Sequence, residues 1–136
     1  MQNPPPVQTP KSSTGLDENV AALLSYVFGW ISGLIFFLIE KDSRLVRFHG
    51  MQSLLYNISV VVVAFVIWIV WFILFFVMAQ ISSMLSTLFS LIGTLLWIVF
   101  FIAVVIGWIF CVIKAYQGQY FKLPIIGNFA EKFSQK

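Results

Sequence analysis

Residues 48–113 read FHGMQSLLYNISVVVVAFVIWIVWFILFFVMAQISSMLSTLFSLIGTLLWIVFFIAVVIGWIFCVI, and this stretch contains no Asp, Glu, Lys or Arg. A charged side chain at the centre of a bilayer costs about 2.5–3.5 kcal/mol on insertion scales, so such a gap is typical of a membrane-embedded segment. Of the 136 residues in the chain, 60% are hydrophobic and 10% are charged. Soluble domains carry about 25% charged residues. The composition therefore predicts an all-α membrane protein and excludes a water-soluble domain.

The hydropathy pattern predicts three transmembrane helices, over residues 20–39, 54–79 and 88–113. About 20 helical residues, at a rise of 1.5 Å each, cross a hydrocarbon core of about 30 Å. The run Val60–Val63 does not indicate a strand, because an isolated strand in lipid leaves its backbone groups unpaired. The polar residues 80–87 are then expected to form a tight turn between the second and third helices.

The remaining segments are predicted to lie outside the hydrocarbon. Residues 1–16 are rich in Pro, Ser and Thr and are expected to form a disordered tail ahead of a single membrane domain over residues 17–136. Interfacial amphipathic segments are expected after the first and third helices, over residues 40–53 and 114–136. In the second of these, a helix beginning near Pro124 would place its large apolar residues on one face: Ile125, Ile126, Phe129 and Phe133.

The basic residues predict an orientation for this three-helix arrangement. Three spans would place the N-terminal tail and the 80–87 turn on one side, and the 40–53 connection and the C-terminal tail on the other. The first side would carry only Lys11, and the second would carry seven basic residues: Lys41, Arg44, Arg47, Lys114, Lys122, Lys132 and Lys136. Because Lys and Arg concentrate on the cytoplasmic side, the N-terminus is expected outside the cell membrane and the C-terminus in the cytoplasm.

Small residues recur at helical spacing in the first and third predicted spans. Such faces let helix backbones approach closely, and packing within the chain is favoured here over dimerisation. The candidates for helix packing are Ser25, Gly29, Gly33, Ala103, Gly107 and Cys111.

Four polar residues before the second span are candidates for an interface with anionic lipid headgroups: Arg44, Arg47, His49 and Gln52. His49 is the only histidine, and it either senses pH or binds a phosphate beside Arg47, or it makes a hydrogen bond that anchors the helix. The last interpretation is favoured.

His49, Gln52 and Ser53 begin one polar stripe, and hydroxyl residues from Ser83 to Thr94 form another. The two stripes indicate either a polar path or interhelical hydrogen bonding, of which the second is favoured.

Several functional classes lack support in the sequence. No charged residue lies within a predicted span, which disfavours ion-coupled transport. There is no nucleophile–base pair, metal-ligand cluster or phosphate-binding glycine loop, so we expect no enzyme, no cofactor and no metal. The single cysteine, Cys111, allows no internal disulfide, and the excess of basic residues indicates membrane orientation rather than nucleic acid binding.

Three stretches carry a resemblance to a known family: GLDENVAALLSYVFGWISGLIFFLIEK (Gly15–Lys41), RFHGMQS (Arg47–Ser53) and KLPIIGNFAEKF (Lys122–Phe133). They resemble the small, uncharacterised multi-pass membrane proteins of bacteria and archaea, a family often linked loosely with the chloroplast inner-envelope protein import component. The resemblance implies a prokaryotic multi-pass membrane protein without an established activity. The chloroplast relatives are four-helix proteins, whereas three spans are predicted here.

These features together predict a non-enzymatic scaffold or assembly protein of the cell membrane. Its expected partners are the lipid bilayer, with anionic lipids among them, and other membrane proteins or further copies of itself. Two alternatives stay open at this point: an oligomeric pore or protein-translocation component, and an anionic-lipid headgroup binder.

Overall fold

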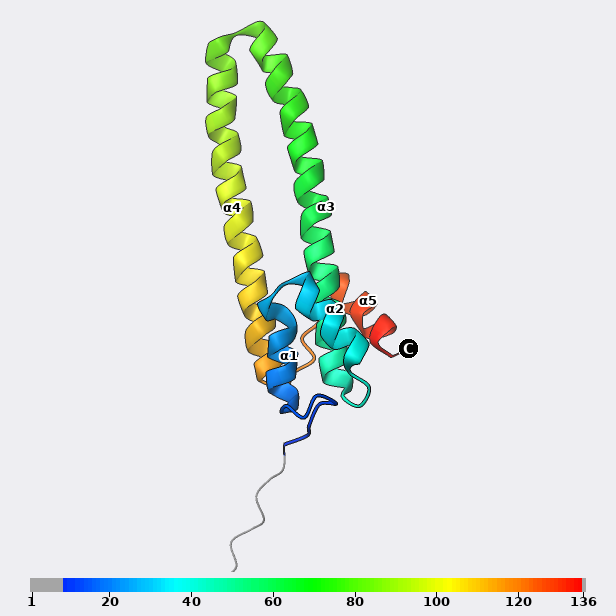
Figure 1. The fold of residues 1–136 in the computed structure, drawn as a ribbon. Helices are drawn as coiled ribbons and strands as arrows, with labels where there is room; N and C mark the ends of the chain where they lie inside the picture. Colours follow the sequence, from blue (N-terminus) through cyan, green and yellow to red (C-terminus); the bar gives the residue numbers. More distant parts are fainter. Residues whose placement is uncertain (1–8, 136) are drawn as a thin grey trace, which may run out of the picture. The chain divides into compact units, whose positions relative to one another are not determined.

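The computed structural model describes residues 9–135, and five helices follow one another in this range (Figure 1): α1 (Glu18–Val27), α2 (Trp30–Ile39), α3 (Arg44–Ile81), α4 (Ser83–Tyr116) and α5 (Ile126–Ser134). Within these described residues there is no strand, and a single isolated bridge joins Lys11 to Asp17. The prediction of an all-α chain is therefore confirmed.

The chain divides into two units, which we describe separately. The terminal module consists of the residues up to Asn57 and those from Cys111 onward. The apolar hairpin consists of Ile58–Phe110. Helices α3 and α4 each contribute residues to both units.

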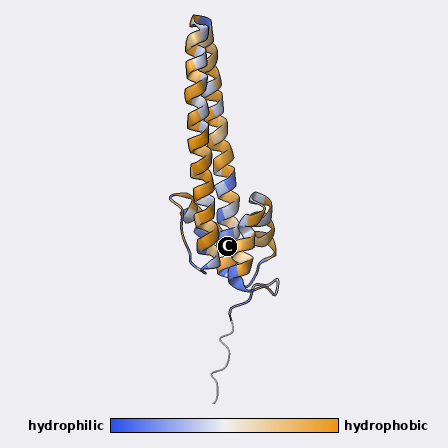
Figure 2. Ribbon diagram, turned by 90° about the vertical axis from the view of Figure 1, so that its left-hand side faces the viewer, coloured by the Kyte–Doolittle hydropathy of each residue, from blue (hydrophilic) through white to orange (hydrophobic). Residues whose placement is uncertain are grey.

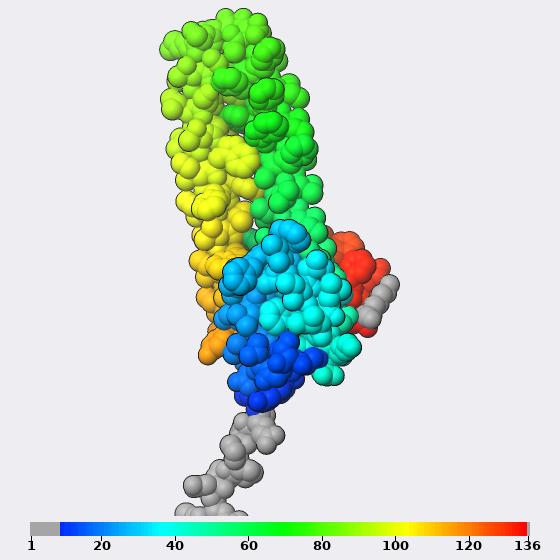
Figure 3. All heavy atoms as spheres, viewed as in Figure 1, coloured from blue at the N-terminus to red at the C-terminus, as the bar shows by residue number. Residues whose placement is uncertain are grey.

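The prediction of a membrane-spanning helix over residues 20–39 is wrong, because the helix breaks at Gly29. The backbone of Gly29 has φ 63° and ψ −132°, a conformation that favours glycine. The two helices on either side, α1 and α2, have 10 residues each and rise about 15 Å, half the thickness of a hydrocarbon core. The chain reverses at Gly29, so that α1 and α2 lie side by side on the surface of the terminal module (Figure 3).

Two helices, α3 with 38 residues and α4 with 34, are long and apolar enough to cross a membrane. They contain the predicted spans 54–79 and 88–113, so residues 9–135 contain two membrane-length helices and not three. Almost no side chain is buried in their most apolar stretches, and Figure 2 shows these helices coloured as hydrophobic along their length.

The polar turn predicted over residues 80–87 is reduced to one non-helical residue, Ser82. The hydroxyls of Ser86 and Thr87 both donate to the carbonyl oxygen of Ser83 at 2.9 Å. Because these hydroxyls bond to their own helix, the polar residues remain helical and the turn is shorter than their composition suggests.

The first turns of α3 replace the interfacial segment predicted over residues 40–53. They are covered by α2, which approaches α3 most closely at Gly33 and Gly50. A Cβ atom on Gly33 would lie 2.8 Å from the carbonyl oxygen of Gly50, and a Cβ atom on Gly50 would lie 2.8 Å from the carbonyl oxygen of Gly33. Eight residues of α3 are buried there: Leu45, Val46, Phe48, His49, Gly50, Met51, Gln52 and Ser53.

The predicted interfacial tail, residues 114–136, contains the end of α4, a connection and α5. A tight γ-turn precedes α5, in which the backbone N–H of Ile126 donates to the carbonyl oxygen of Pro124 at 2.7 Å. Ile125, at the centre of this turn, has φ 67° and ψ −58°, which is a strained conformation for a β-branched residue. The turn sets the direction in which α5 returns to the terminal module.

Helix α5 packs with its small residues inward. Gly127, Ala130 and Ser134 are buried, and Ala130 joins the core cluster around Phe48 and Met51. The large apolar residues predicted to share one face point the other way, and three of them are exposed: Ile125, Phe129 and Phe133. The outer surface of α5 is therefore aromatic and the inner surface is small, the reverse of a helix on a water-soluble protein.

Candidate functional site

Hydrogen bonds connect three fully buried polar side chains of the terminal module, Tyr26 of α1 and His49 and Gln52 of α3. The Tyr26 hydroxyl lies 2.9 Å from His49 Nδ1, and Gln52 Nε2 donates to the same hydroxyl oxygen at 3.2 Å. The second ring nitrogen of His49, Nε2, lies 2.9 Å from the carbonyl oxygen of Gln119. A carbonyl oxygen only accepts, so His49 carries a proton on Nε2, and in the neutral ring Nδ1 accepts the Tyr26 proton.

The same network holds the connection between α4 and α5. Gln52 Nε2 donates to the carbonyl oxygen of Phe121 at 3.0 Å, and Gln52 Oε1 accepts from the backbone N–H of Leu123 at 3.4 Å. An unsatisfied buried backbone group costs about 1–3 kcal/mol, so these bonds stabilise the connection in its place. His49 and Gln52, which the sequence suggested as headgroup contacts, lie in the interior of the terminal module instead.

A second polar cluster surrounds Glu40, whose side chain is buried at the end of α2. Its carboxylate accepts from the Ser12 hydroxyl, from the Ser13 hydroxyl at 2.7 Å and from the backbone N–H of Ser43 at 2.9 Å. Burial alone would raise the pKa of this carboxyl, but the hydrogen bonds from Ser12, Ser13 and Ser43 outweigh it and lower the pKa to about 2. Glu40 is therefore ionised at neutral pH and ties the N-terminal segment to α2.

This cluster does not follow from the sequence pattern. The composition predicts disorder over residues 1–16, of which residues 1–8 lie outside the described residues. Ser12 and Ser13, in the described part, bind a carboxylate that is 27 or 28 positions further along the chain. A local sequence pattern does not predict a contact over this separation. The contact forms because the chain reverses at Gly29 and brings the end of α2 back to the N-terminal segment.

Arg47 joins the C-terminal ends of α2 and α5. Its Nη1 donates to the carbonyl oxygens of Glu40 at 2.9 Å and Phe37 at 3.3 Å, which lie at a helix end where no further turn satisfies them. Its Nε donates to the carbonyl oxygen of Ser134 at 3.2 Å, and its guanidinium carbon lies 4.8 Å from the centre of the Phe37 ring. These contacts fix the guanidinium and leave its Nη2 group for a further partner.

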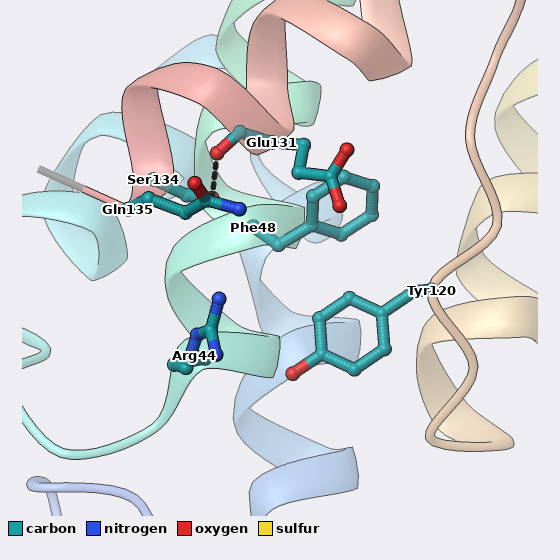
Figure 4. A pocket seen from close by; sticks show the side chains of 6 residues that line it. All are labelled: Arg44, Phe48, Tyr120, Glu131, Ser134 and Gln135. Carbon is teal, nitrogen blue, oxygen red and sulfur yellow. Dashed lines mark hydrogen bonds between the residues drawn. The ribbon is translucent and has the colours of Figure 1, made fainter.

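Arg44 is exposed and lines two pockets of the terminal module. Figure 4 shows the first, of about 260 Å³, lined by Arg44, Phe48, Tyr120, Glu131, Ser134 and Gln135. The second has a volume of about 430 Å³ and is basic, lined by Lys41, Arg44, Arg47, Ser134 and Gln135. Of the four predicted headgroup residues, the structure therefore brings Arg44 and Arg47 to one pocket and places His49 and Gln52 elsewhere.

The packing candidates of the first predicted span lie around the reversal of the chain. The Ser25 hydroxyl is buried and donates to the carbonyl oxygen of Ala21 at 3.1 Å. Gly29 forms the turn itself, and its carbonyl oxygen accepts from the Ser53 hydroxyl at 3.0 Å. Gly33 makes the close approach to α3.

The packing candidates of α4 differ from one another in exposure. Cys111 is buried in the terminal module, where its sulfur lies 3.8 Å from Gln52 Nε2. Gly107 is half-buried and Ala103 is exposed, both in the apolar hairpin. The structure thus shows no continuous small-residue contact along this face of α4.

The apolar hairpin has one close contact of its own, where Trp71 of α3 meets α4. The Trp71 ring stacks on Phe89 with centroids 4.0 Å apart, and a Cβ atom on Gly93 would lie 2.3 Å from that ring. The hydroxyls of Ser90 and Thr94 each donate to a carbonyl oxygen four residues earlier, at 2.9 Å. This polar stripe is therefore satisfied within its own helix.

The groups with acid–base or nucleophilic chemistry are occupied by protein contacts. Throughout residues 9–135, every buried side-chain nitrogen and oxygen has a hydrogen-bond partner. In the same range, no three residues among His, Cys, Asp and Glu lie close enough together to hold a metal ion. The buried polar network therefore stabilises the terminal module.

Comparison with known proteins gives a consistent set of relatives. The sequence model of the magnetosome magnetite crystal formation protein family matches residues 16–130. A UPF0132 membrane protein of Methanocaldococcus jannaschii is 40% identical over 125 residues, which cover 92% of this chain and 96% of the relative. A UPF0132 membrane protein of Archaeoglobus fulgidus is 36% identical over 117 residues, which cover 86% of this chain and 95% of the relative.

A second UPF0132 membrane protein of Methanocaldococcus jannaschii is 34% identical over 119 residues, which cover 88% of this chain and 71% of the relative. No solved structure matches the chain. The expected resemblance to an uncharacterised membrane-protein family is confirmed, whereas similarity to the chloroplast import component is not shown.

Proposed function

Because the chain belongs to the magnetosome magnetite crystal formation protein family, and its relatives are membrane proteins, we propose that it is a non-enzymatic integral membrane scaffold. In this proposal α3 and α4 cross the bilayer and hold the terminal module at one of its surfaces. The module then contacts lipid and other membrane proteins through its outer faces.

The observation that carries this proposal is the distribution of polarity in the terminal module. Among the described residues, every buried polar side chain of the module has a hydrogen-bond partner, and several large apolar side chains are exposed. Phe28 at the reversal is 75% exposed and Leu38 on α2 is 64% exposed. These apolar side chains are exposed although the module already has a buried core. Large exposed apolar surfaces are typical of sites that contact lipid or another protein.

The same burial supports a non-enzymatic role. His49 and Cys111 lie inside the module, and Glu40 is held by serine hydrogen bonds. A catalytic group must reach its substrate within hydrogen-bond distance. The polar atoms of these three side chains instead contact other groups of the protein.

The positions of the helices also change the proposed orientation. With two spans, the N-terminal segment, residues 40–43 and the C-terminal tail share one side of the membrane, and the Ser82 turn lies on the other. All eight Lys and Arg residues of the chain are then on the first side, because none occurs between Arg47 and Lys114. The positive-inside rule places both termini in the cytoplasm of a prokaryotic cell. The expectation of an external N-terminus depended on the third span and is replaced.

Labelling of single cysteines in sealed cells tests this orientation. In a Cys111→Ala background, we expect Ser82→Cys to react with a membrane-impermeant maleimide, and Lys11→Cys and Lys132→Cys to react only after the cells are opened. Labelling of Lys11→Cys in sealed cells would contradict the proposed orientation.

The family description names magnetite crystal formation, which is a property of the proteins so described. For this chain we propose a narrower role, the assembly of proteins at a membrane, because its geometry supports that role. A role in mineral formation would then come through the proteins that it positions, since its described residues hold no metal-ligand group.

Photo-crosslinking in native membranes tests the scaffold. A benzoylphenylalanine residue in place of Phe28 or Phe129 should yield protein adducts of defined mass, either with a partner or with a second copy of the chain. The matched control replaces Phe101, an exposed aromatic of the apolar hairpin, and should yield lipid adducts alone. Lipid adducts alone at Phe28 and Phe129 as well would overturn the scaffold.

A further inference from the structure

The basic pocket of the terminal module lies where three segments meet. It is lined by Lys41 before α3, by Arg44 and Arg47 in the first turn of α3, and by Ser134 and Gln135 at the end of α5. Its volume of about 430 Å³ is within the range of ligand sites in proteins, which is about 300–1,000 Å³. Three cationic side chains therefore line one cavity.

One cation of this pocket, Arg47, is held in place by the protein itself. It is fixed by the carbonyl oxygens of Phe37, Glu40 and Ser134, which use its Nε and Nη1 groups. None of these hydrogen bonds among the described residues uses its Nη2 group. The positive end of the α3 dipole adds to the same field, since Arg44 is the first residue of that helix.

The nearby carboxylates are already engaged. Glu40 accepts from Ser12 and Ser13, Asp42 accepts from the Ser13 hydroxyl at 2.9 Å, and Glu18 accepts from the Ser43 hydroxyl. Glu131, which lines the adjoining pocket in Figure 4, is paired with Lys122, on the α4–α5 connection. Among the described residues this is the single ion pair, so Lys41 and Arg44 have no carboxylate partner.

The helix whose end lines the pocket, α5, also carries exposed aromatic side chains. Phe133 immediately precedes Ser134 in α5, and Phe133 and Phe129 are 42% and 51% exposed. One ligand class matches both surfaces, because an anionic phospholipid has phosphate oxygens for the cations and hydrocarbon chains for the aromatic face.

We propose that the pocket lined by Lys41, Arg44 and Arg47 binds the phosphate of an anionic phospholipid, whose chains lie against the exposed face of α5. The inference rests on the proposed function in one respect, the location of the terminal module at the membrane surface. Arg44 and Arg47 present planar donors to the phosphate oxygens, and Lys41 adds charge. Bound lipid would then join the ends of α2, α3 and α5.

The full chain, purified in detergent, can be titrated with short-chain phosphatidylglycerol and followed by native mass spectrometry and by its thermal midpoint. Short-chain phosphatidylcholine tests the need for net negative charge, and inorganic phosphate tests for a free anion. We expect phosphatidylglycerol to be retained and to raise the midpoint, and both other probes to bind at least about tenfold more weakly. Equal binding of phosphatidylcholine, or equal binding of inorganic phosphate, would overturn a lipid site of this kind.

Charge-matched variants separate the pocket from general electrostatic attraction. Lys41→Gln with Arg44→Gln removes two exposed cations from the pocket, and Lys11→Gln with Lys132→Gln removes two exposed cations elsewhere. Each basic residue near an anionic surface contributes about 1 kcal/mol, a factor of about five, so diffuse attraction predicts the same loss for both pairs. The site predicts a loss of at least about 20-fold for the pocket pair and less than about threefold for the control pair. Equal losses would overturn it.

The two proposals fail in different ways. If the pocket variant retains phosphatidylglycerol while photo-crosslinking still gives protein adducts, the lipid site is wrong and the scaffold stands. If phosphatidylglycerol binding depends on the pocket but only lipid adducts form, the lipid site stands and the scaffold is wrong.

Discussion

The terminal module and the apolar hairpin use different kinds of interaction to define their structures. The module contains the buried polar network of Tyr26, His49 and Gln52 and the close approach of Gly33 to Gly50. The hairpin is made of side chains that are almost all exposed, with hydroxyls bonded to their own helices. In the module particular residues are required, whereas in most of the hairpin an apolar character is sufficient. Substitutions of equal size should therefore have unequal effects in the two units.

The largest difference is expected between Gly33→Val and Ala103→Val. A side chain at position 33 would collide with the backbone of Gly50, and neither helix can move without opening the module. We expect Gly33→Val to cost about 3 kcal/mol or more and to lower the yield of folded chain. Ala103 is exposed on α4, so its variant should lie within about 0.5 kcal/mol of the parent. Thermal unfolding in detergent measures both, and equal losses would show that the comparison is wrong.

Removal of the network should have the next largest effect. Gln52→Leu leaves the Phe121 carbonyl and the Leu123 N–H without their side-chain partner, which predicts a loss of about 2–4 kcal/mol. Thr94→Val is the matched change in the hairpin, where an exposed hydroxyl bonds to its own helix. It should cost less than about 0.5 kcal/mol, as read from the same unfolding transition. A Gln52→Leu chain as stable as the parent would refute the structural role of the network.

Acid should weaken the terminal module through Glu40. Its pKa is lowered from an ordinary value of 4.5 to about 2, so its contribution to stability is complete above about pH 4.5 and is lost as the pH falls toward 2. Glu40→Gln should cost about 2 kcal/mol at pH 7 and flatten this part of the acid profile. Glu131→Gln, which breaks a half-exposed surface ion pair, should cost less than about 1 kcal/mol. Unfolding free energies between pH 7 and 2.5 give the comparison, and an unchanged profile in Glu40→Gln would contradict it.

The smallest effect is expected from a change at the contact between Gly93 and Trp71 in the hairpin. Gly93→Ala places a methyl group 2.3 Å from the Trp71 ring, and the group that must move is a half-buried side chain rather than backbone. We expect a loss of less than about 1 kcal/mol and a shift in tryptophan fluorescence, which reports a new ring environment. A loss as large as that of Gln52→Leu would show that the hairpin is as specifically packed as the module.

The same division explains which features the sequence predicts. The spans over residues 54–79 and 88–113 follow from apolar composition alone, and both are confirmed as parts of membrane-length helices. The break at Gly29 does not follow, because glycine is common in membrane helices and its conformation here depends on contacts with α3. The Ser53 hydroxyl donates to the Gly29 carbonyl oxygen, and a Cβ atom at position 29 would lie 3.3 Å from Asn57 Oδ1.

Two further features depend on contacts between distant residues. An amphipathic pattern in α5 predicts two faces but not which of them meets the protein, and the structure buries Ala130 while it exposes Phe129 and Phe133. The basic pocket likewise joins Lys41 and Arg44 to Gln135, more than 90 positions later. Charge and hydropathy along the chain carry no information on such pairings.

The single-residue link at Ser82 has a consequence for biogenesis. Its backbone N–H donates to the carbonyl oxygen of Met78 at 3.0 Å, and its own carbonyl oxygen accepts from the backbone N–H of Ser86 at 3.1 Å, so both backbone groups of the linking residue are paired. In the proposed two-span topology, the segment that must be translocated is short and uncharged. Helices α3 and α4 would then enter the bilayer together as a pair, while the cationic ends of the chain stay on the side of the ribosome. The proposed topology therefore requires a single insertion event.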